Sequence, residues 1–148
     1  MDKPIAKTYL IRPFQPADRS GVLALWAEVF PEESAWNHGA DVIDRKLQVQ
    51  QELFLVVVEA ERVLGTLLAG YDGVRGWVHR LAVTPSRRRQ GLASLLMAAA
   101  EHGLRAYGCA KLNLQVRGDN LAVLEFYRAL GYAVEDRASL GKALIKHD

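Results

Sequence analysis

The sequence contains very little cysteine: Cys109 is the only one in 148 residues. A single cysteine cannot form a disulfide within the chain, so a small domain held together by disulfides is excluded. This cysteine usage fits a reducing compartment, and we expect a cytoplasmic protein. The 4 histidines lie far apart and lack the spacing of metal ligands, so we expect no metal site.

Long apolar runs are also missing. No stretch approaches the roughly 20 apolar residues that a membrane-spanning helix needs. The first residues, MDKPIAKTYLIRPF, show neither the apolar core nor the cleavage site of a signal peptide. The formal net charge is only +2, which does not by itself indicate a nucleic acid or an anionic membrane as partner. We therefore expect neither among the partners.

What is present is the composition of an ordinary globular protein, with 50% hydrophobic and 24% charged residues. The chain is long enough to bury a sizeable core, and it contains no repeat, low-complexity tract or linker. We expect a single domain over residues 1–148.

The hydrophobic pattern predicts alternating strands and helices. Strands are expected at residues 8–14, 53–59, 63–71, 76–83 and 111–117, with two closing strands at 132–140 and 142–147. Helices are expected at residues 18–30, 40–50, 91–107 and 121–130. This order predicts an α+β fold of three layers (α/β/α), in which about four helices cover a mixed, mostly antiparallel sheet of about six or seven strands.

The segment VTPSRRRQGLASLL, residues 83–96, places three arginines directly before Gly91 and a helix of small residues. The free N–H groups at a helix start attract anions, and a small residue lets a phosphate approach the backbone. The arginines can add charge-assisted hydrogen bonds to phosphate oxygens. The segment is neither a P-loop nor GxGxxG. An exposed basic turn and a nucleic-acid contact remain open as alternatives.

Two motifs carry a resemblance to a known family. LAVTPSRRRQGLASLL resembles the acetyl-CoA-binding motif of the GNAT superfamily of N-acetyltransferases, where a strand ending in Val-x-Pro leads into a glycine-containing helix start. NLAVLEFYRALGY resembles the second signature of that family: Asn120, Tyr127, Gly131 and Tyr132 match, and the small residue, Ala122, lies one position early. The chain is most similar to small bacterial GNAT proteins of the YpeA type.

The resemblance implies acetyl-CoA as co-substrate. Backbone groups of Leu81, Ala82 and Val83 would pair with its pantetheine arm like an added strand. Arg87 or Arg89 would reach the 3′-phosphate, and Asn120 would position the cofactor near the thioester. The backbone N–H groups expected to hold the pyrophosphate belong to Arg88, Arg89, Gln90, Gly91, Leu92, Ala93 and Ser94.

The resemblance also implies catalytic roles. Tyr127 matches the general acid of the family, and a backbone N–H at or near Val83 would bind the oxyanion. The base is expected to be His79 or Glu59, unless a chain of water molecules replaces it. Ribosomal-protein N-terminal acetyltransferases carry a glutamate where this chain has Gln115. An amide cannot accept a proton at neutral pH, so this difference weakens the comparison with those enzymes.

The acceptor pocket of such a fold would draw on the loop PEESAWNHG. Acidic and aromatic side chains suit a cationic amine, although a solvated loop explains the same residues. The turn YDGVRGW offers further rim groups. The expected acceptor residues are Glu33, Trp36, Asn37, Tyr71 and Gln115, with Glu32, Asp72 and Arg75 as additional candidates.

The sequence thus favours an acetyl-CoA-dependent N-acetyltransferase that transfers the acetyl group directly to a primary amine in a ternary complex. The acceptor would be a small molecule or a peptide, and the protein a monomer or homodimer. The alternatives are a non-catalytic CoA-binding regulatory module and a protein N-terminal acetyltransferase.

Overall fold

The computed structural model describes residues 8–145. Contacts divide the chain into two compact units, of which the first ends at Asn113 and the second begins at Leu114. The segment relevant to a leader peptide, residues 1–7, lies outside the described residues, as do His147 and the end of the last expected strand.

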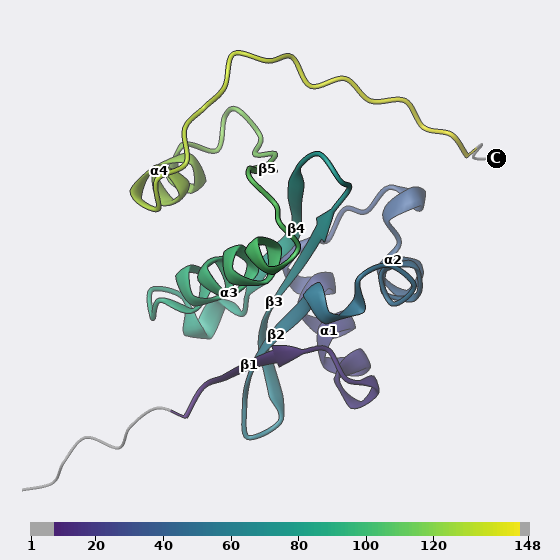
Figure 1. Cartoon of the computed structure of the whole chain (residues 1–148). Helices are drawn as coiled ribbons and strands as arrows, with labels where there is room; N and C mark the ends of the chain where they lie inside the picture. The colour runs from purple at the N-terminus through teal and green to yellow at the C-terminus, as the bar shows by residue number, and fades with distance from the viewer. Residues whose placement is uncertain (1–7, 146–148) are drawn as a thin grey trace, which may run out of the picture. The chain divides into compact units, whose positions relative to one another are not determined.

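A five-stranded sheet in the order β1-β2-β3-β4-β5 organises the fold. Its first four strands, which lie in the first unit, pair antiparallel with their neighbours (Figure 1). The turns expected between β2, β3 and β4 are confirmed. Ala60 and Glu61 form the first with positive φ angles of 49° and 65°, and Gly73 lies in the second at 94°. The strands are β1 (Leu10–Pro13), β2 (Phe54–Glu59), β3 (Arg62–Tyr71), β4 (Gly76–Val83) and β5 (Leu112–Leu114).

The helices form where the sequence predicts them, with ends shifted by a few residues. Short 3-10 turns connect them, among them η2 (Ala35–Asn37) and η4 (Pro85–Arg87). The α-helices are α1 (Arg19–Val29), α2 (Gly39–Lys46), α3 (Leu92–Ala106) and α4 (Leu121–Ala129). In the first unit, α3 lies on one side of the sheet, and α1 and α2 lie on the other (Figure 1).

Side-chain alternation in β2 explains these layers. Phe54, Val56 and Val58 belong to one buried cluster with residues of α1 and α2. The residues between them point to the opposite face, because successive side chains of a strand alternate. There, a Cβ on Gly65 of β3 would lie 2.9 Å from Val57 and 3.3 Å from Leu96 of α3. The near-continuous apolar sequence of β2 therefore buries both faces, and the expected three-layer α+β fold is confirmed.

The pairing of β3 with β4 contains a β-bulge. Leu68 faces His79 and Thr66 faces Ala82, so two residues of β4, Arg80 and Leu81, stand opposite one residue of β3. Arg80 has a positive φ of 55°. Such an extra residue bends a strand and redirects its side chains, and bulges are frequent next to active sites.

The second unit contains α4. Asn120 caps this helix as expected, since its side-chain oxygen accepts the N–H of Val123 at 3.3 Å. Gly131 follows the helix with a φ of 96°, the left-handed conformation that favours glycine at a helix end.

The two closing strands expected at 132–140 and 142–147 are wrong for the described residues. The structure assigns no strand between residues 132 and 145. Val134, Leu140 and Leu144 are exposed, at 65%, 93% and 89%. A strand requires hydrogen-bonding partners along its length, and the local pattern that suggested these strands does not supply them. The sheet therefore has fewer strands than the sequence predicted.

Within residues 8–145, no helix has the length and apolar character needed to span a membrane.

Candidate active site

The backbone of Val83, at the end of β4, faces away from β3. Thr84 donates its N–H to the carbonyl oxygen of Leu64 at 2.8 Å. Thr84 and Leu64 are therefore a hydrogen-bonded pair of the antiparallel ladder. The neighbouring pair, Val83 and Gly65, is then of the kind whose N–H and C=O groups point outward. Val83 thus offers one donor and one acceptor on the side of β4 opposite β3.

The strand β5 is too short to cover these groups. It begins beside the start of β4, where Gly76 donates to the carbonyl oxygen of Lys111 at 2.8 Å. Val83 lies seven residues after Gly76 along β4, a distance of about 23 Å at roughly 3.3 Å per residue. The three residues of β5 span only about 10 Å. Within the first unit, no strand therefore covers the outer edge of β4 near Val83, and the N–H and C=O of Val83 can pair with an extended ligand.

Helix α3 begins at Leu92, nine residues after Val83. Gly91 is its N-cap and has a φ of 80°, and a Cβ placed on it would meet no atom within 4 Å. The positive φ favours glycine. The glycine has no side chain that could bond the first helical N–H groups, so those of Leu92, Ala93 and Ser94 remain available to an anion.

Arg88 and Arg89 flank this helix start and are exposed. Within residues 8–145 neither side chain has a hydrogen bond or an ion pair. Arg89 has a φ of 64°. Two uncompensated guanidinium groups beside free backbone donors form a concentrated positive site, which suits a phosphate group.

Arg87, in contrast, already has partners within the protein. It forms an ion pair with Glu59 at the end of β2, at 2.8 Å. Hydrogen bonds to Glu59 and Tyr9 raise the pKa of its guanidinium above the ordinary value. The Tyr9 hydroxyl also donates to Gln90. These contacts tie the loop before α3 to the end of β2 and to the residue before β1. They also engage the carboxylate of Glu59, one of the two expected bases.

The other expected base, His79, lies on the sheet face that carries α1 and α2, because it stands opposite Leu68 of that core. Surrounding protein atoms shield part of its ring although the residue is exposed. This shielding lowers its pKa, and the positive charges of Lys46 and Arg80 lower it further. His79 is therefore neutral at pH 7 and able to accept a proton.

Lys46, on α2, explains part of this effect. Its ammonium donates to the carbonyl oxygens of Ala69 at 2.5 Å and Val49 at 2.9 Å. Burial lowers its pKa. The cation is held by carbonyl dipoles, so its positive charge still acts on the imidazole of His79.

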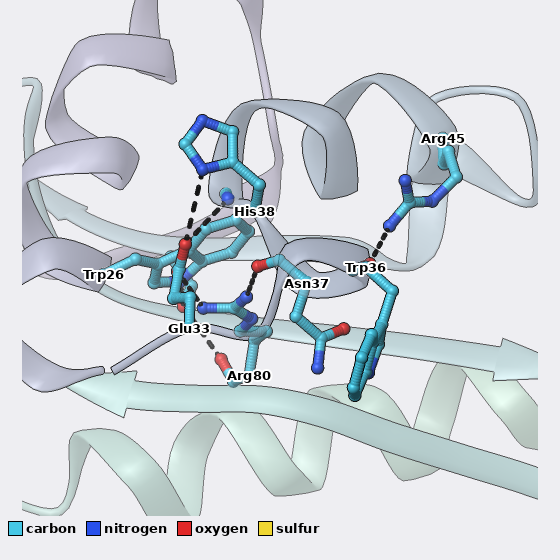
Figure 2. Close-up of polar contacts among 9 residues, drawn as sticks. Trp26, Glu33, Trp36, Asn37, His38, Arg45 and Arg80 are labelled. Carbon is cyan, nitrogen blue, oxygen red and sulfur yellow. Dashed lines mark hydrogen bonds and ion pairs between the residues drawn. The ribbon is translucent and has the colours of Figure 1, made fainter. Parts of the chain in front are cut away.

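The loop expected to bind the acceptor is fastened to β4 by Arg80 (Figure 2). The Arg80 guanidinium donates to Glu33 at 2.8 Å and to the backbone carbonyl of Asn37 at 2.5 Å. It also stacks on Trp26 and Phe30, 4.7 Å and 5.1 Å from their ring centres. The loop is thus attached three residues before Val83 on the same strand.

The remaining expected acceptor residues lie in different places. Trp36 is exposed at 46%, and its carbonyl oxygen accepts from Arg45 at 2.6 Å. Tyr71 stands opposite Gly76, at the end of β4 remote from Val83. Asp72 holds its own turn by accepting the N–H groups of Val74 and Arg75, each at 2.8 Å.

In the second unit, Tyr127 is buried, with 9% exposure. Its ring makes edge contacts with Phe126 and Tyr132. Burial raises the pKa of its phenol to about 12, so the hydroxyl stays protonated at neutral pH. Gln115 donates its side-chain amide to the hydroxyl of Ser139.

Sequence reasoning missed Arg80, Thr66 and Trp26. Trp26 donates its indole N–H to Thr66 at 2.9 Å, and Thr66 donates to the carbonyl of Arg80 at 2.9 Å. The only local signal is the consecutive pair His79-Arg80 in an otherwise apolar strand, which indicates a break in alternation. Among the described residues, no group of three or more histidine, cysteine, aspartate or glutamate side chains could hold a metal ion.

Comparison with known proteins identifies the family of this chain. The model of the acetyltransferase (GNAT) family matches residues 19–132, a range that crosses the boundary between the two units. An acetyltransferase of Yersinia enterocolitica is 42% identical over 135 residues, 91% of this chain and 95% of the relative. An acetyltransferase of Sodalis glossinidius is 42% identical over 137 residues, 92% and 96% of the two chains.

Solved structures show the same fold. Ard1 of Thermoplasma volcanium has a TM-score of 0.75 at 26% identity and covers 86% of this chain and 84% of its own. The aminoglycoside N-acetyltransferase AAC(6')-Iy in complex with CoA has a TM-score of 0.79 at 19% identity, with 97% and 99% coverage. Taken with the family match and the two motifs, these similarities establish that this chain is a member of the GNAT family of acetyltransferases.

Proposed function

We propose that this protein transfers the acetyl group of acetyl-CoA to a primary amine by direct attack of the amine on the thioester. The observation that carries the proposal is the open edge of β4 at Val83, followed by a glycine-capped helix start with two free arginines. An extended amide-containing arm fits the first feature, and a pyrophosphate fits the second.

The donor would be held mainly by backbone groups. The outward C=O of Val83 and the backbone of Leu81 pair with the amides of the pantetheine arm, while Ala82 turns its own groups toward β3. The N–H groups at the start of α3 bind the pyrophosphate, with Arg88 and Arg89 adding charge. Because Arg87 is bound to Glu59, Arg89 is the better candidate for the 3′-phosphate.

Bound acetyl-CoA supplies an activated acyl group, and the chain supplies proton transfer and charge stabilisation. The outward backbone N–H of Val83, which that pairing leaves free, stabilises negative charge on the thioester carbonyl. His79, neutral at pH 7, accepts the proton of the amine, a role for which Glu59 is less suited because it is paired with Arg87. Tyr127 donates a proton to the departing thiolate, and Asn120 helps to position the donor.

Calorimetric titration with CoA tests the donor site. The substitution Gly91→Glu places a carboxylate where the pyrophosphate is expected, and CoA binding should be lost. Gly91→Ala is the matched control, because it introduces the same backbone strain at positive φ without charge or length. Wild-type affinity in the Gly91→Glu protein contradicts the proposed phosphate site.

A turnover screen tests the reaction. CoA release from acetyl-CoA is measured with polyamines, amino acids, aminosugars and N-terminal peptides as acceptors. Turnover with one class identifies the acceptor chemistry. Turnover with peptides alone favours a protein N-terminal acetyltransferase, and CoA binding without any turnover favours a non-catalytic CoA-binding module.

A further inference from the structure

We infer that Arg80 and Glu33 form a positioning pair that fixes the acceptor loop, residues 31–39, on the bulge of β4, and that Glu33 is an anchor of this loop and not a ligand for the acceptor's charge. The inference rests on the proposed function as far as the acceptor is concerned. The fastening of the loop itself rests on the structure alone.

The guanidinium of Arg80 is held by two hydrogen bonds to the loop and by two aromatic rings. Its two terminal nitrogens reach Glu33 at 2.8 Å and the carbonyl oxygen of Asn37 at 2.5 Å; Glu33 precedes the turn η2, and Asn37 is the last residue of that turn. The aromatic faces of Trp26 and Phe30 cover the guanidinium. Its side chain is only 11% exposed. A planar group held by two hydrogen bonds and two rings has little freedom to serve as a mobile substrate ligand.

Both carboxylate oxygens of Glu33 are occupied. One accepts from Arg80, and the other accepts the N–H of Gly39, the first residue of α2, at 3.0 Å. Partial burial alone would raise the pKa of Glu33, but the hydrogen bonds from Arg80 and Gly39 and nearby positive charge lower it overall. Glu33 therefore stays ionised and compensated, and it cannot supply an uncompensated negative charge to a cationic acceptor.

The backbone at Arg80 is fixed independently of this side chain. Its carbonyl accepts from Thr66, which in turn accepts from Trp26. The bulge places Arg80 in the left-handed region, with a φ of 55°, and directs its side chain to the face that carries α1. Because the same strand continues to Val83, the pair links the position of the acceptor loop to the edge where the donor is proposed to bind.

These contacts assign acceptor recognition to loop residues whose side chains remain outside the pair. Trp36 is 46% exposed, and Asn37 is held to Arg80 through its backbone, leaving its side-chain amide available. Loss of Arg80 or Glu33 should displace both side chains together. A displacement of about 1 Å in a reacting geometry can reduce rates about 100-fold.

A double-mutant cycle separates an anchor from a ligand. Arg80→Gln, Glu33→Gln and the double variant are compared, using one diamine and one monoamine that the wild-type protein acetylates. For an anchor, each single variant raises the KM of both amines by about 10-fold or more, and the double variant is no worse than the poorer single variant. The dissociation constant of CoA should not change, and Arg80→Lys should recover part of the acceptor KM.

The control is the Arg12–Asp18 ion pair, which also joins a strand to a helix start, at 2.7 Å and with 18% and 3% exposed side chains. Arg12→Gln should lower stability without raising the acceptor KM. If Glu33→Gln impairs only the diamine, or if the effects of the two single variants add, Glu33 is a ligand and the inference is wrong.

Hydrogen exchange provides a readout that requires no acetylation. Amides of residues 31–39, including that of Gly39, should exchange faster in Arg80→Gln and in Glu33→Gln, but not in Arg12→Gln. Unchanged exchange refutes the fastening of the loop even if the protein is an active acetyltransferase. Faster exchange in a protein that acetylates no amine refutes the proposed function and leaves the fastening established.

Discussion

The hydroxyl of Thr66 bonds Trp26 and Arg80 at the same time. It accepts the indole N–H of Trp26 and donates to the carbonyl oxygen of Arg80, each at 2.9 Å. Thr66 and Trp26 are 0% and 1% exposed. One hydroxyl therefore connects α1 to the bulge of β4 through the middle of the sheet.

Replacing Thr66 by valine should destabilise the fold. The shape is retained, but the buried indole N–H and the carbonyl of Arg80 lose their partner, at a cost of about 1–3 kcal/mol. Denaturant unfolding measures the effect. Thr66→Ser keeps the hydroxyl and should lose only about 0.8 kcal/mol for the missing methyl group. Equal losses in both variants would show that the hydroxyl contributes nothing.

The three consecutive arginines should separate into two functions. Arg87→Ala should lower the melting temperature, because it breaks the pair with Glu59, and Glu59→Gln should have a similar effect. Arg89→Ala should leave the melting temperature unchanged but weaken CoA binding about 10-fold, the equivalent of one charge-assisted hydrogen bond. Thermal melts and calorimetry measure the two effects.

Dephospho-CoA identifies the phosphate involved. If Arg89 binds the 3′-phosphate, the wild-type protein and Arg89→Ala should bind dephospho-CoA equally well. A loss of CoA affinity that is confined to Arg87→Ala would reverse the assignment.

His79 should titrate below its ordinary pKa. Shielding from water and the charges of Lys46 and Arg80 lower the pKa, so an NMR titration should place its midpoint below about 6.5. The unfolded chain binds the proton more tightly, so the contribution of His79 to stability is present above about pH 6.5 and is lost as the pH falls.

The variant Lys46→Met tests the cause of this shift. Removing the positive charge should move the His79 midpoint upward, toward the ordinary value. If His79 is the base, the acid limb of the kcat/KM profile should move with it. A limb that stays in place while the NMR midpoint moves would exclude His79 as the base.

Tyr127→Phe should reduce kcat about 100-fold or more, as expected for loss of a general acid, with the dissociation constant of CoA nearly unchanged. The phenol acts on the leaving group, so binding of the donor should not depend on it. Wild-type turnover in this variant would remove the acid role. Single-turnover kinetics separate the chemical step from product release.

Burial of Tyr127 also predicts a dependence on alkaline pH. Its pKa is raised to about 12, above the value of about 10 expected in the unfolded chain. Its contribution to stability is therefore complete below about pH 10 and is lost as the pH rises toward 12. Between pH 9 and pH 11.5, the wild-type protein should lose more unfolding free energy than Tyr127→Phe.

Local features were predictable because they depend on neighbours in the sequence. Apolar and β-branched runs bounded by turn residues predicted β2 to β4, Asn120 predicted the start of α4, and Gly91 predicted the start of α3. The two motifs predicted the family for the same reason, since each consists of a few residues at fixed spacing within one strand–helix unit.

The pairing of side chains depended on the tertiary structure. In the sequence, Glu33 is a candidate ligand for a cationic acceptor, and the three consecutive arginines look equivalent. The fold pairs Glu33 with Arg80, and it pairs Arg87 with Glu59. The expected closing strands also depended on the tertiary structure, because a strand forms only where another strand offers backbone partners.

The sequence by itself therefore determined the helices, the first five strands, their order and the family, and it supplied the proposal of a phosphate-binding loop, because all of these depend on local periodicity and short motifs. The tertiary structure decided which charges are compensated and which backbone groups remain open. A one-residue bulge at Arg80 and Leu81 sets the direction of the side chains in β4, and the local sequence does not encode which groups that shift brings together.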